Sequence, residues 1–274
     1  MQEPGNIKGA ITFSEKISVG ETLVVAGKNL ENLLLWKTRP GAAVTVSDNN
    51  GRLFRARVGK PDKNGRYSLL IFEDTGFEKT HLFITLLQAL PEKERMELII
   101  QKTTELGVGR IAPFESEKSI SLEQRESKQK KAHKWEEIAL RAAKQSRRES
   151  IPDVLPCSSF KEALGLPSRT AGWPSWPAGK AEESGLRIML AESNGPAGGP
   201  SGTAGRLDDL KGFLRGKNVS KVAILVGPEG GFGQDEVEEA QKNGFIPITL
   251  GGRILRTETA AIIGVGLVRY ELGW

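Results

Sequence analysis

The chain has 274 residues, 38% of them hydrophobic, and carries a formal net charge of +5. This length fits two domains. No stretch approaches the roughly 18 apolar residues of a membrane span, and residues 1–6 lack a secretory signal pattern. Cys157 is the only cysteine and there are two histidines, which argues against a disulfide framework and against a metal site. We therefore expect a cytoplasmic protein that needs neither metal nor membrane.

Short β-rich runs separated by turn residues fill the first part of the chain. They lie at residues 22–26, 43–47, 53–58 and 67–72, with turns at 48–51 and 61–65. Several short strands of this kind predict a small barrel over residues 1–75. In the third run Phe54, Ala56 and Val58 should face the core, with Arg55 and Arg57 outside. No helical period appears before about residue 90.

The pattern then changes to that of an α/β domain, predicted over residues 76–274. An apolar run at 82–87 predicts a buried strand, and the apolar spacing after Pro91 predicts a helix that stops at Gly107. Residues 108–114 predict a further strand, and a second helix follows around 135–143. Strands alternating with helices indicate a parallel sheet.

Positive charge is concentrated between Arg125 and Arg148, a segment that contains nine basic and three acidic residues. A phosphate-rich partner would explain such a concentration. A solvated helix face is the commoner explanation of a charge run.

Residues 165–205 are rich in proline, glycine, serine and alanine and predict surface loops around one strand at 186–191. Within these loops Trp173 and Trp176 could stack on a base or cover a local apolar patch.

The C-terminal segment is the most regular. It predicts a strand at 222–226, a tight loop at 227–231, a helix at 235–243 and a strand at 246–250 that Pro247 confines to an edge or a strand start. A second loop at 251–256 precedes an apolar helix that Thr257 could cap.

Common nucleotide signatures are missing, because no P-loop occurs and the glycines at 227, 230 and 231 do not fit the dinucleotide fingerprint. Both glycine-rich loops nevertheless leave the carboxyl ends of predicted strands, where ligands bind in open α/β sheets. Glycines there allow the backbone to approach a flat ring closely. On spacing alone the loops could form a ligand site or be simple turns.

Four segments together closely resemble the RsmE-type methyltransferases of the SPOUT superfamily. They are Gly227-Pro-Glu-Gly-Gly-Phe, Leu250-Gly-Gly-Arg-Ile-Leu-Arg-Thr-Glu-Thr-Ala, the helix at 92–108 and the basic element at 142–152. The resemblance implies S-adenosylmethionine-dependent methylation of N3 of one uridine in 16S ribosomal RNA. It also implies a C-terminal trefoil knot, an N-terminal PUA-like barrel and a homodimer that acts on the small subunit.

The resemblance further implies a set of cofactor-binding residues, and the chemistry of the reaction and the positions of basic residues suggest catalytic and RNA-contact roles. The expected cofactor-binding residues are Leu190, Ala191, Glu192, Gly227, Pro228, Glu229, Gly230, Gly231, Leu250, Gly251, Ile254, Leu255, Arg256 and Thr257. Arg256 would stabilise charge on the uracil carbonyls, while Glu229 or Glu258 would accept the N3 proton or orient Arg256. Either carboxylate could instead be structural, and a structural role is favoured for Glu258 at a helix start. The expected RNA contacts are Arg55, Arg57, Lys93, Arg95, Arg141, Lys144, Gln145 and Arg148.

The chain departs from the family pattern at Lys144, where an acidic residue is usual, at Arg147, where glycine is usual, and at residues 34–39. These changes affect the expected RNA contacts rather than the cofactor site. Two other functions stay open: methylation of another RNA atom such as a ribose 2′-hydroxyl, and a non-catalytic ribosome-assembly factor.

Overall fold

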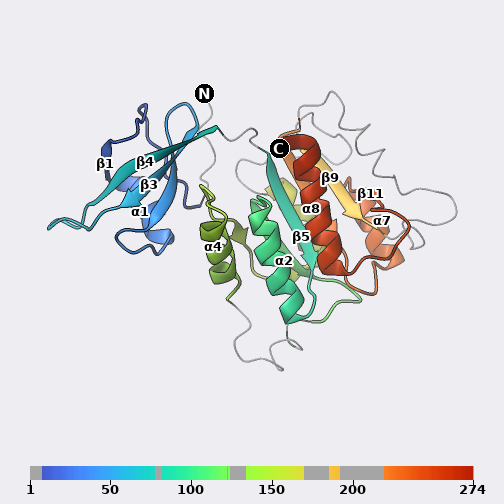
Figure 1. The fold of residues 1–274 in the computed structure, drawn as a ribbon. Coiled ribbons are helices and arrows are strands. Elements are labelled where there is room, and N and C mark those ends of the chain that lie inside the picture. Colours follow the sequence, from blue (N-terminus) through green and yellow to red (C-terminus); the bar gives the residue numbers. More distant parts are fainter. Residues whose placement is uncertain are drawn as a thin grey trace. The chain divides into compact units, whose positions relative to one another are not determined.

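A computed structural model of the chain describes residues 8–77, 82–121, 123, 134–169, 185–191 and 219–273 (Figure 1). Two compact units are present. One comprises Met1–Lys79 with Ala139–Pro152, and the other comprises Thr80–Ile138 with Asp153–Trp274. This division differs from the contiguous one expected at residue 75, because Ala139–Pro152 belongs to the N-terminal unit.

The N-terminal unit is built on a four-stranded antiparallel sheet. Its strands are β1 (Thr22–Val25), β2 (Ala43–Ser47), β3 (Arg52–Val58) and β4 (Tyr67–Phe77), in the order β1-β4-β3-β2. All four lie where the alternating pattern predicted strands. The prediction for β3 is confirmed for Phe54, Ala56 and Val58, which are buried, and for Arg57, which is exposed, whereas Arg55 is half-buried.

A helix that the sequence reading missed lies between the first two strands. Helix α1 (Gly27–Leu35) contradicts the statement that no helical period precedes residue 90. Only Asn32 and Leu33 are buried on it, and Leu34 and Leu35 are exposed. The three consecutive leucines therefore show no helical spacing of apolar residues, although only one of them is buried. A helix that starts at glycine also has a low intrinsic helix propensity.

The core of this unit explains why the chain returns to it after residue 138. Leu140, Ala143 and Ile151 are buried in one cluster with strand residues such as Val46 and Phe54. The backbone amide of Ile151 also donates to the carbonyl of Lys8, at 2.9 Å. Residues distant in sequence thus complete a core that the first 79 residues do not supply alone.

The C-terminal unit contains a seven-stranded sheet whose neighbouring strands are all parallel. The strands are β5 (Phe83–Ala89), β6 (Arg110–Glu115), β7 (Asp153–Val154), β8 (Ser158–Ser159), β9 (Gly185–Leu190), β10 (Lys221–Val226) and β11 (Ile246–Ile248). Their order is β11-β9-β10-β5-β6-β7, and β8 also pairs with β6. The predicted parallel α/β sheet is confirmed, and Pro247 lies on an edge strand as expected.

Helices cover both faces of this sheet. One face packs against α5 (Phe160–Arg169) and α7 (Gln234–Lys242) through a cluster that includes Phe114, Ala163 and Val237. On the other face α2 (Lys93–Glu105) and α8 (Thr257–Gly273) lie side by side (Figure 1). Gly264 brings α8 close to the sheet, since a Cβ there would lie 2.7 Å from Leu190 Cδ1.

The remaining predicted elements have mixed outcomes. Helix α2 buries Met96, Ile99, Ile100 and Thr103 as its spacing predicted, and helix α4 (Trp135–Gln145) buries Trp135, Ala139, Ala142 and Ala143. The expected strand at 186–191 is β9. The loop predicted from residue 165 is wrong for residues 165–169, which form the end of helix α5. Residues 170–184 and 192–218, with Trp173 and Trp176, lie outside the described residues, so the predicted loops are not tested there. None of the described helices combines the length and apolar character needed to cross a membrane.

Candidate functional site

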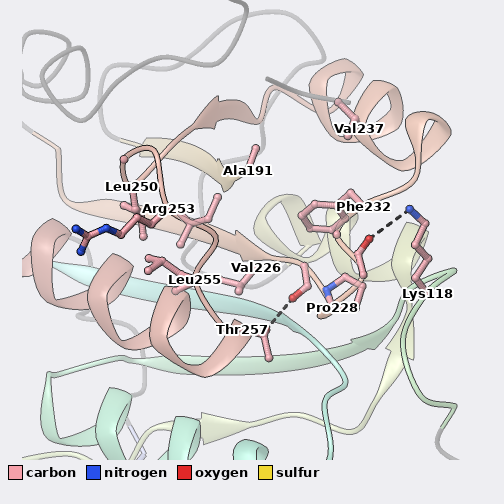
Figure 2. Close-up of a pocket in the computed structure, with 16 residues that line it drawn as sticks. Lys118, Ala191, Val226, Pro228, Phe232, Val237, Leu250, Arg253, Leu255 and Thr257 are labelled. Atoms are coloured by element: carbon pink, nitrogen blue, oxygen red, sulfur yellow. Dashed lines mark hydrogen bonds between the residues drawn. The ribbon is translucent and has the colours of Figure 1, made fainter. Parts of the chain in front are cut away.

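Three adjacent strands end at one cavity. Because β11, β9 and β10 are neighbours and parallel, the segments after Leu190, Val226 and Ile248 leave the same edge of the sheet. The cavity there has a volume of about 110 Å³. Its lining comprises Lys118, Leu190, Ala191, Val226, Gly227, Pro228, Gly230, Gly231, Phe232, Val237, Leu250, Gly251, Arg253, Leu255, Thr257 and Ala260 (Figure 2).

The loop after β10 needs its glycines for geometric reasons. Gly231 has φ 67°, a left-handed conformation that suits glycine, and its amide donates to the Pro228 carbonyl at 3.0 Å. Gly227 packs directly on the Phe232 ring, where a Cβ would approach Cε2 to 2.9 Å. A side chain at either position would therefore change the wall of the cavity.

The loop after β11 forms the open side of the cavity. Gly251 has φ 113°, and a Cβ placed on it would meet no atom within 4 Å. Arg253 lies in the same loop, at the opposite end of the cavity from Lys118 (Figure 2). Lys118 follows β6 and its ammonium donates to the Gly230 carbonyl at 3.3 Å. Both ends of an otherwise mainly apolar cavity are thus positively charged.

A hydrogen-bonded chain connects three segments at the floor of the cavity. The hydroxyl of Thr257 donates to the Gly227 carbonyl at 2.8 Å and accepts from the buried Gln88 amide at 2.9 Å. The expectation that Thr257 caps α8 is wrong, because Thr257 is already the first residue of the helix and Arg256 stands at the N-cap position. The backbone carbonyl of Arg256 accepts the first helical bond, from Ala260.

A buried carboxylate anchors the segment that carries Lys118. Glu236, in the first turn of α7, accepts from the Gly233 amide at 3.0 Å, the Ser116 hydroxyl at 3.0 Å and the Glu117 amide at 3.1 Å. The same carboxylate therefore holds both the loop before α7 and the segment after β6.

Most of the predicted cofactor-binding residues lie together. The lining includes Leu190, Ala191, Gly227, Pro228, Gly230, Gly231, Leu250, Gly251, Leu255 and Thr257. Glu192 lies outside the described residues. The side chains of Glu229, Ile254 and Arg256 do not line the cavity, and Ile254 is 77% exposed. In the segment 253–257 lining and non-lining residues alternate, which a contiguous sequence motif does not reveal.

The three proposed catalytic residues have different surroundings. Glu229 is paired with Arg95 of α2, which was predicted to contact RNA. Arg256 is exposed, whereas Glu258 is buried and its Oε2 has no hydrogen-bond partner among the described residues. Glu229 therefore forms an ion pair with an arginine, whereas Glu258 retains an unused acceptor.

Six lining residues were not predicted. Phe232, Arg253 and Ala260 stand inside the recognised motifs, and Val226 immediately precedes one, so the motifs could have indicated them. Val237 carries the helical spacing of a core residue. Lys118 gave no sequence signal, because only the parallel pairing of β5 with β6 brings its segment to this edge.

The predicted RNA-contact residues do not form one group. Arg55, Lys144 and Arg148 line a second cavity, within the N-terminal unit, together with Lys37, Arg39 and Arg147. Arg57 donates to the Gly41 carbonyl and stacks over Phe72. Lys93 lies 3.9 Å from Glu97, while Arg141 and Gln145 are exposed.

Among the described residues, no three histidine, cysteine, aspartate or glutamate side chains come together as a metal site would require. His81 and His133 lie outside the described residues.

Residues 78–269 match the model of a family described as the RNA methyltransferase domain. The chain belongs to this RNA methyltransferase family. The match includes every residue that lines the cavity at the ends of β9, β10 and β11. Family membership therefore agrees with the placement of the site in the C-terminal unit.

Individual relatives indicate to which group within the family the chain is most similar. The chain is 26% identical over 261 residues to the ribosomal RNA small subunit methyltransferase E of Bacillus subtilis, covering 94% of this chain and 93% of that protein. It is 31% identical to the enzyme of the same name from Buchnera aphidicola subsp. Schizaphis graminum, covering 70% of this chain and 67% of that protein. These matches place the chain in the methyltransferase E group.

Solved structures agree with this placement. The methyltransferase E of Neisseria gonorrhoeae, bound to S-adenosylmethionine, matches with a TM-score of 0.60 at 29% identity, covering 96% of this chain and 97% of that one. A putative methyltransferase of Legionella pneumophila with bound S-adenosylmethionine matches with a TM-score of 0.57 at 25% identity, covering 95% and 97%. The α/β fold is thus shared with proteins that bind this cofactor.

Proposed function

We propose that this chain transfers a methyl group from S-adenosylmethionine to N3 of a uridine in 16S ribosomal RNA of the small subunit. One observation carries the proposal: the two loops that resemble the RsmE-type motifs meet at a single cavity. The binding of S-adenosylmethionine by two similar structures supports it.

The residues of the cavity suit this cofactor. Leu190, Val226 and Leu255 present an apolar surface, and glycine-rich loops leave backbone groups accessible to a purine ring. Arg253 and Lys118 offer positive charge for a carboxylate. The cavity is smaller than the roughly 300–1,000 Å³ of most ligand pockets, so a bound cofactor would extend across the open side at Gly251.

Bound S-adenosylmethionine would supply an electrophilic methyl group. The chain's own residues must then align the uracil ring, and alignment alone contributes a large part of catalysis. N3 lies on the pairing edge and carries a proton at neutral pH, so the uridine must be unpaired or drawn out of its helix. Arg256, exposed beside the cavity loop, would stabilise negative charge that develops on the uracil carbonyls.

The proton on N3 needs an acceptor. Glu229 and Glu258 are the two candidates, and both could instead be structural. The ion pair with Arg95 supports a structural role for Glu229. Glu258 is buried, and its Oε2 has no hydrogen-bond partner among the described residues. This supports a role for Glu258 in holding the proton or orienting Arg256.

The finer architecture belongs to the same proposal. The antiparallel N-terminal sheet supports a PUA-like RNA-binding domain, which was expected over residues 1–75 and is completed by Ala139–Pro152. The remainder of residues 76–274 would form the SPOUT domain. The C-terminal chain would form the trefoil knot of that superfamily, a threading that ordinary topology rarely shows. A homodimer is supported by the exposed apolar side chains of Leu98 on α2 and Ile263 and Tyr270 on α8. A cytoplasmic location is part of the same proposal, and action on ribosomal RNA supports it.

The test is methylation of unmodified small-subunit particles and of naked 16S RNA with labelled S-adenosylmethionine, followed by mass mapping. The expected product is one N3-methyluridine, which blocks base pairing and stops reverse transcription. A 2′-O-methylated ribose would contradict the N3 assignment. Absence of transfer combined with absence of cofactor binding by calorimetry would leave only an RNA-binding assembly factor.

A further inference from the structure

The N-terminal unit holds two residues in an unusual backbone conformation. Lys37 has φ 47° and Arg147 has φ 57°, and they are the non-glycine residues with positive φ in the described part of the chain. Each follows a helix, since Lys37 lies just after α1 and Arg147 just after α4. Glycine normally takes this left-handed position at a helix end because it has no Cβ. Both positions here carry a long basic side chain instead.

The two residues line the same cavity, which has a volume of about 520 Å³. Its basic lining residues are Lys37, Arg39, Arg55, Lys144, Arg147 and Arg148, and no carboxylate side chain is among the lining residues. They come from three separate segments of the chain: the turn after α1, strand β3 and the end of α4. Tertiary folding therefore gathers charge that the sequence spreads over more than a hundred residues.

Hydrogen bonds hold these segments together. The Thr45 hydroxyl donates to the Arg147 carbonyl at 2.8 Å, and Arg55 Nη1 donates to Thr45 Oγ1 at 2.7 Å. The Lys144 ammonium donates to the Lys37 carbonyl at 3.4 Å. The left-handed backbone of Arg147 is thus fixed by its neighbours, which keeps its side chain at the cavity.

Like charges face one another in this cavity. Burial and then the positive charge of Arg147 lower the pKa of Arg55, against the opposing effect of Glu73 on the adjacent strand. Burial and then Lys37 lower the pKa of Lys144. Mutual repulsion of this kind is relieved when an anion binds, and phosphate groups are the anions that clustered Arg and Lys recognise.

We propose that this cavity binds backbone phosphates of the RNA substrate and that Arg147 is one of the phosphate ligands. The identity of the RNA rests on the proposed function, whereas the phosphate site rests on the cavity. Because phosphate contacts position RNA without reading its sequence, the site would orient the substrate for the C-terminal unit rather than select the uridine.

The sharpest variant is Arg147→Gly. Glycine adopts φ 57° without strain, so folding should be retained or improved while the guanidinium is removed. The matched control is Lys60→Ala, which removes one positive charge from an exposed residue of the same unit outside the cavity. Arg147→Lys keeps the charge but loses the two-pronged geometry.

The measurement is equilibrium binding of unmodified 16S RNA transcript over a series of KCl concentrations. Arg147→Gly should weaken binding and reduce the slope of log K against log salt by about 0.7–0.9 for each lost phosphate contact. Arg147→Lys should restore part of the affinity, and Lys60→Ala should match the wild type. Affinity for S-adenosylmethionine should be the same in all four proteins.

Two results would overturn the proposal: wild-type RNA binding by Arg147→Gly, or an equal loss in Arg147→Gly and Lys60→Ala. Neither result bears on the proposed methyl transfer, which would be refuted by a different observation, namely that the wild-type protein methylates no RNA.

Discussion

At the scale of single residues, the two arginines of the 251–256 loop are the ones whose roles the structure separates. Arg253 lines the cavity and Arg256 does not. We expect Arg256→Ala to lower kcat by about 10²–10³, the cost of one preorganised donor, with an unchanged dissociation constant for S-adenosylmethionine. Arg253→Ala should weaken cofactor binding. Single-turnover methyl transfer and calorimetry measure the two effects, and undiminished turnover by Arg256→Ala would remove its catalytic role.

Thr257 is the second residue whose chemistry can be tested directly. Valine has nearly the same shape but cannot donate to the Gly227 carbonyl or accept from Gln88. Thr257→Val should therefore lower the free energy of unfolding by about 1–3 kcal/mol and raise the KM for S-adenosylmethionine, because the Gly227 loop loses its tether. Thr257→Ser keeps the hydroxyl and should resemble the wild type in both measurements. Equal KM values for the valine and serine variants would refute this tethering.

At the scale of elements, Glu236 joins the start of α7 to the segment after β6. Replacing it with glutamine places an amide donor against at least one of the donors that now bind the carboxylate. Glu236→Gln should cost about 1–3 kcal/mol and speed amide hydrogen exchange in residues 116–118 and 230–233. Glu238→Gln, an exposed change on the same helix, should stay within about 0.5 kcal/mol. Unaltered exchange in Glu236→Gln would show that the segment is held in another way.

At the scale of the whole molecule, the two units have separate cores. Ile151→Ala should destabilise the N-terminal unit by about 2–5 kcal/mol, because Ile151 is 6% exposed within its core. Ile224→Ala, in the central strand β10, should do the same to the C-terminal unit. S-adenosylmethionine at a hundred times its dissociation constant should raise the free energy of unfolding of the C-terminal unit alone by about 2.7 kcal/mol. Differential scanning calorimetry follows both transitions, and a single transition that all three changes shift together would show that the units unfold as one.

Much of this architecture could be predicted because it depends on short-range patterns. Alternation in residues 53–58 placed Phe54, Ala56 and Val58 in a core, and the helical spacing of Met96, Ile99 and Ile100 placed α2. The two glycine loops could be placed at strand ends because each follows an apolar run. Helix α1 could not be predicted in this way, because only Asn32 and Leu33 are buried on it and its nine residues show no helical spacing of apolar side chains.

Most of the strands and helices, the parallel sheet and the glycine loops could be predicted from the sequence, because they follow from hydrophobic periodicity and turn chemistry. The tertiary structure was needed to show that Lys118 lines the cavity, that Glu229 is paired with Arg95, and that Ala139–Pro152 completes the N-terminal core. It also decided that Lys37, Arg55 and Arg147 share one cavity. These facts join residues far apart in the chain, and strand order and core packing, rather than any local pattern, bring such residues together.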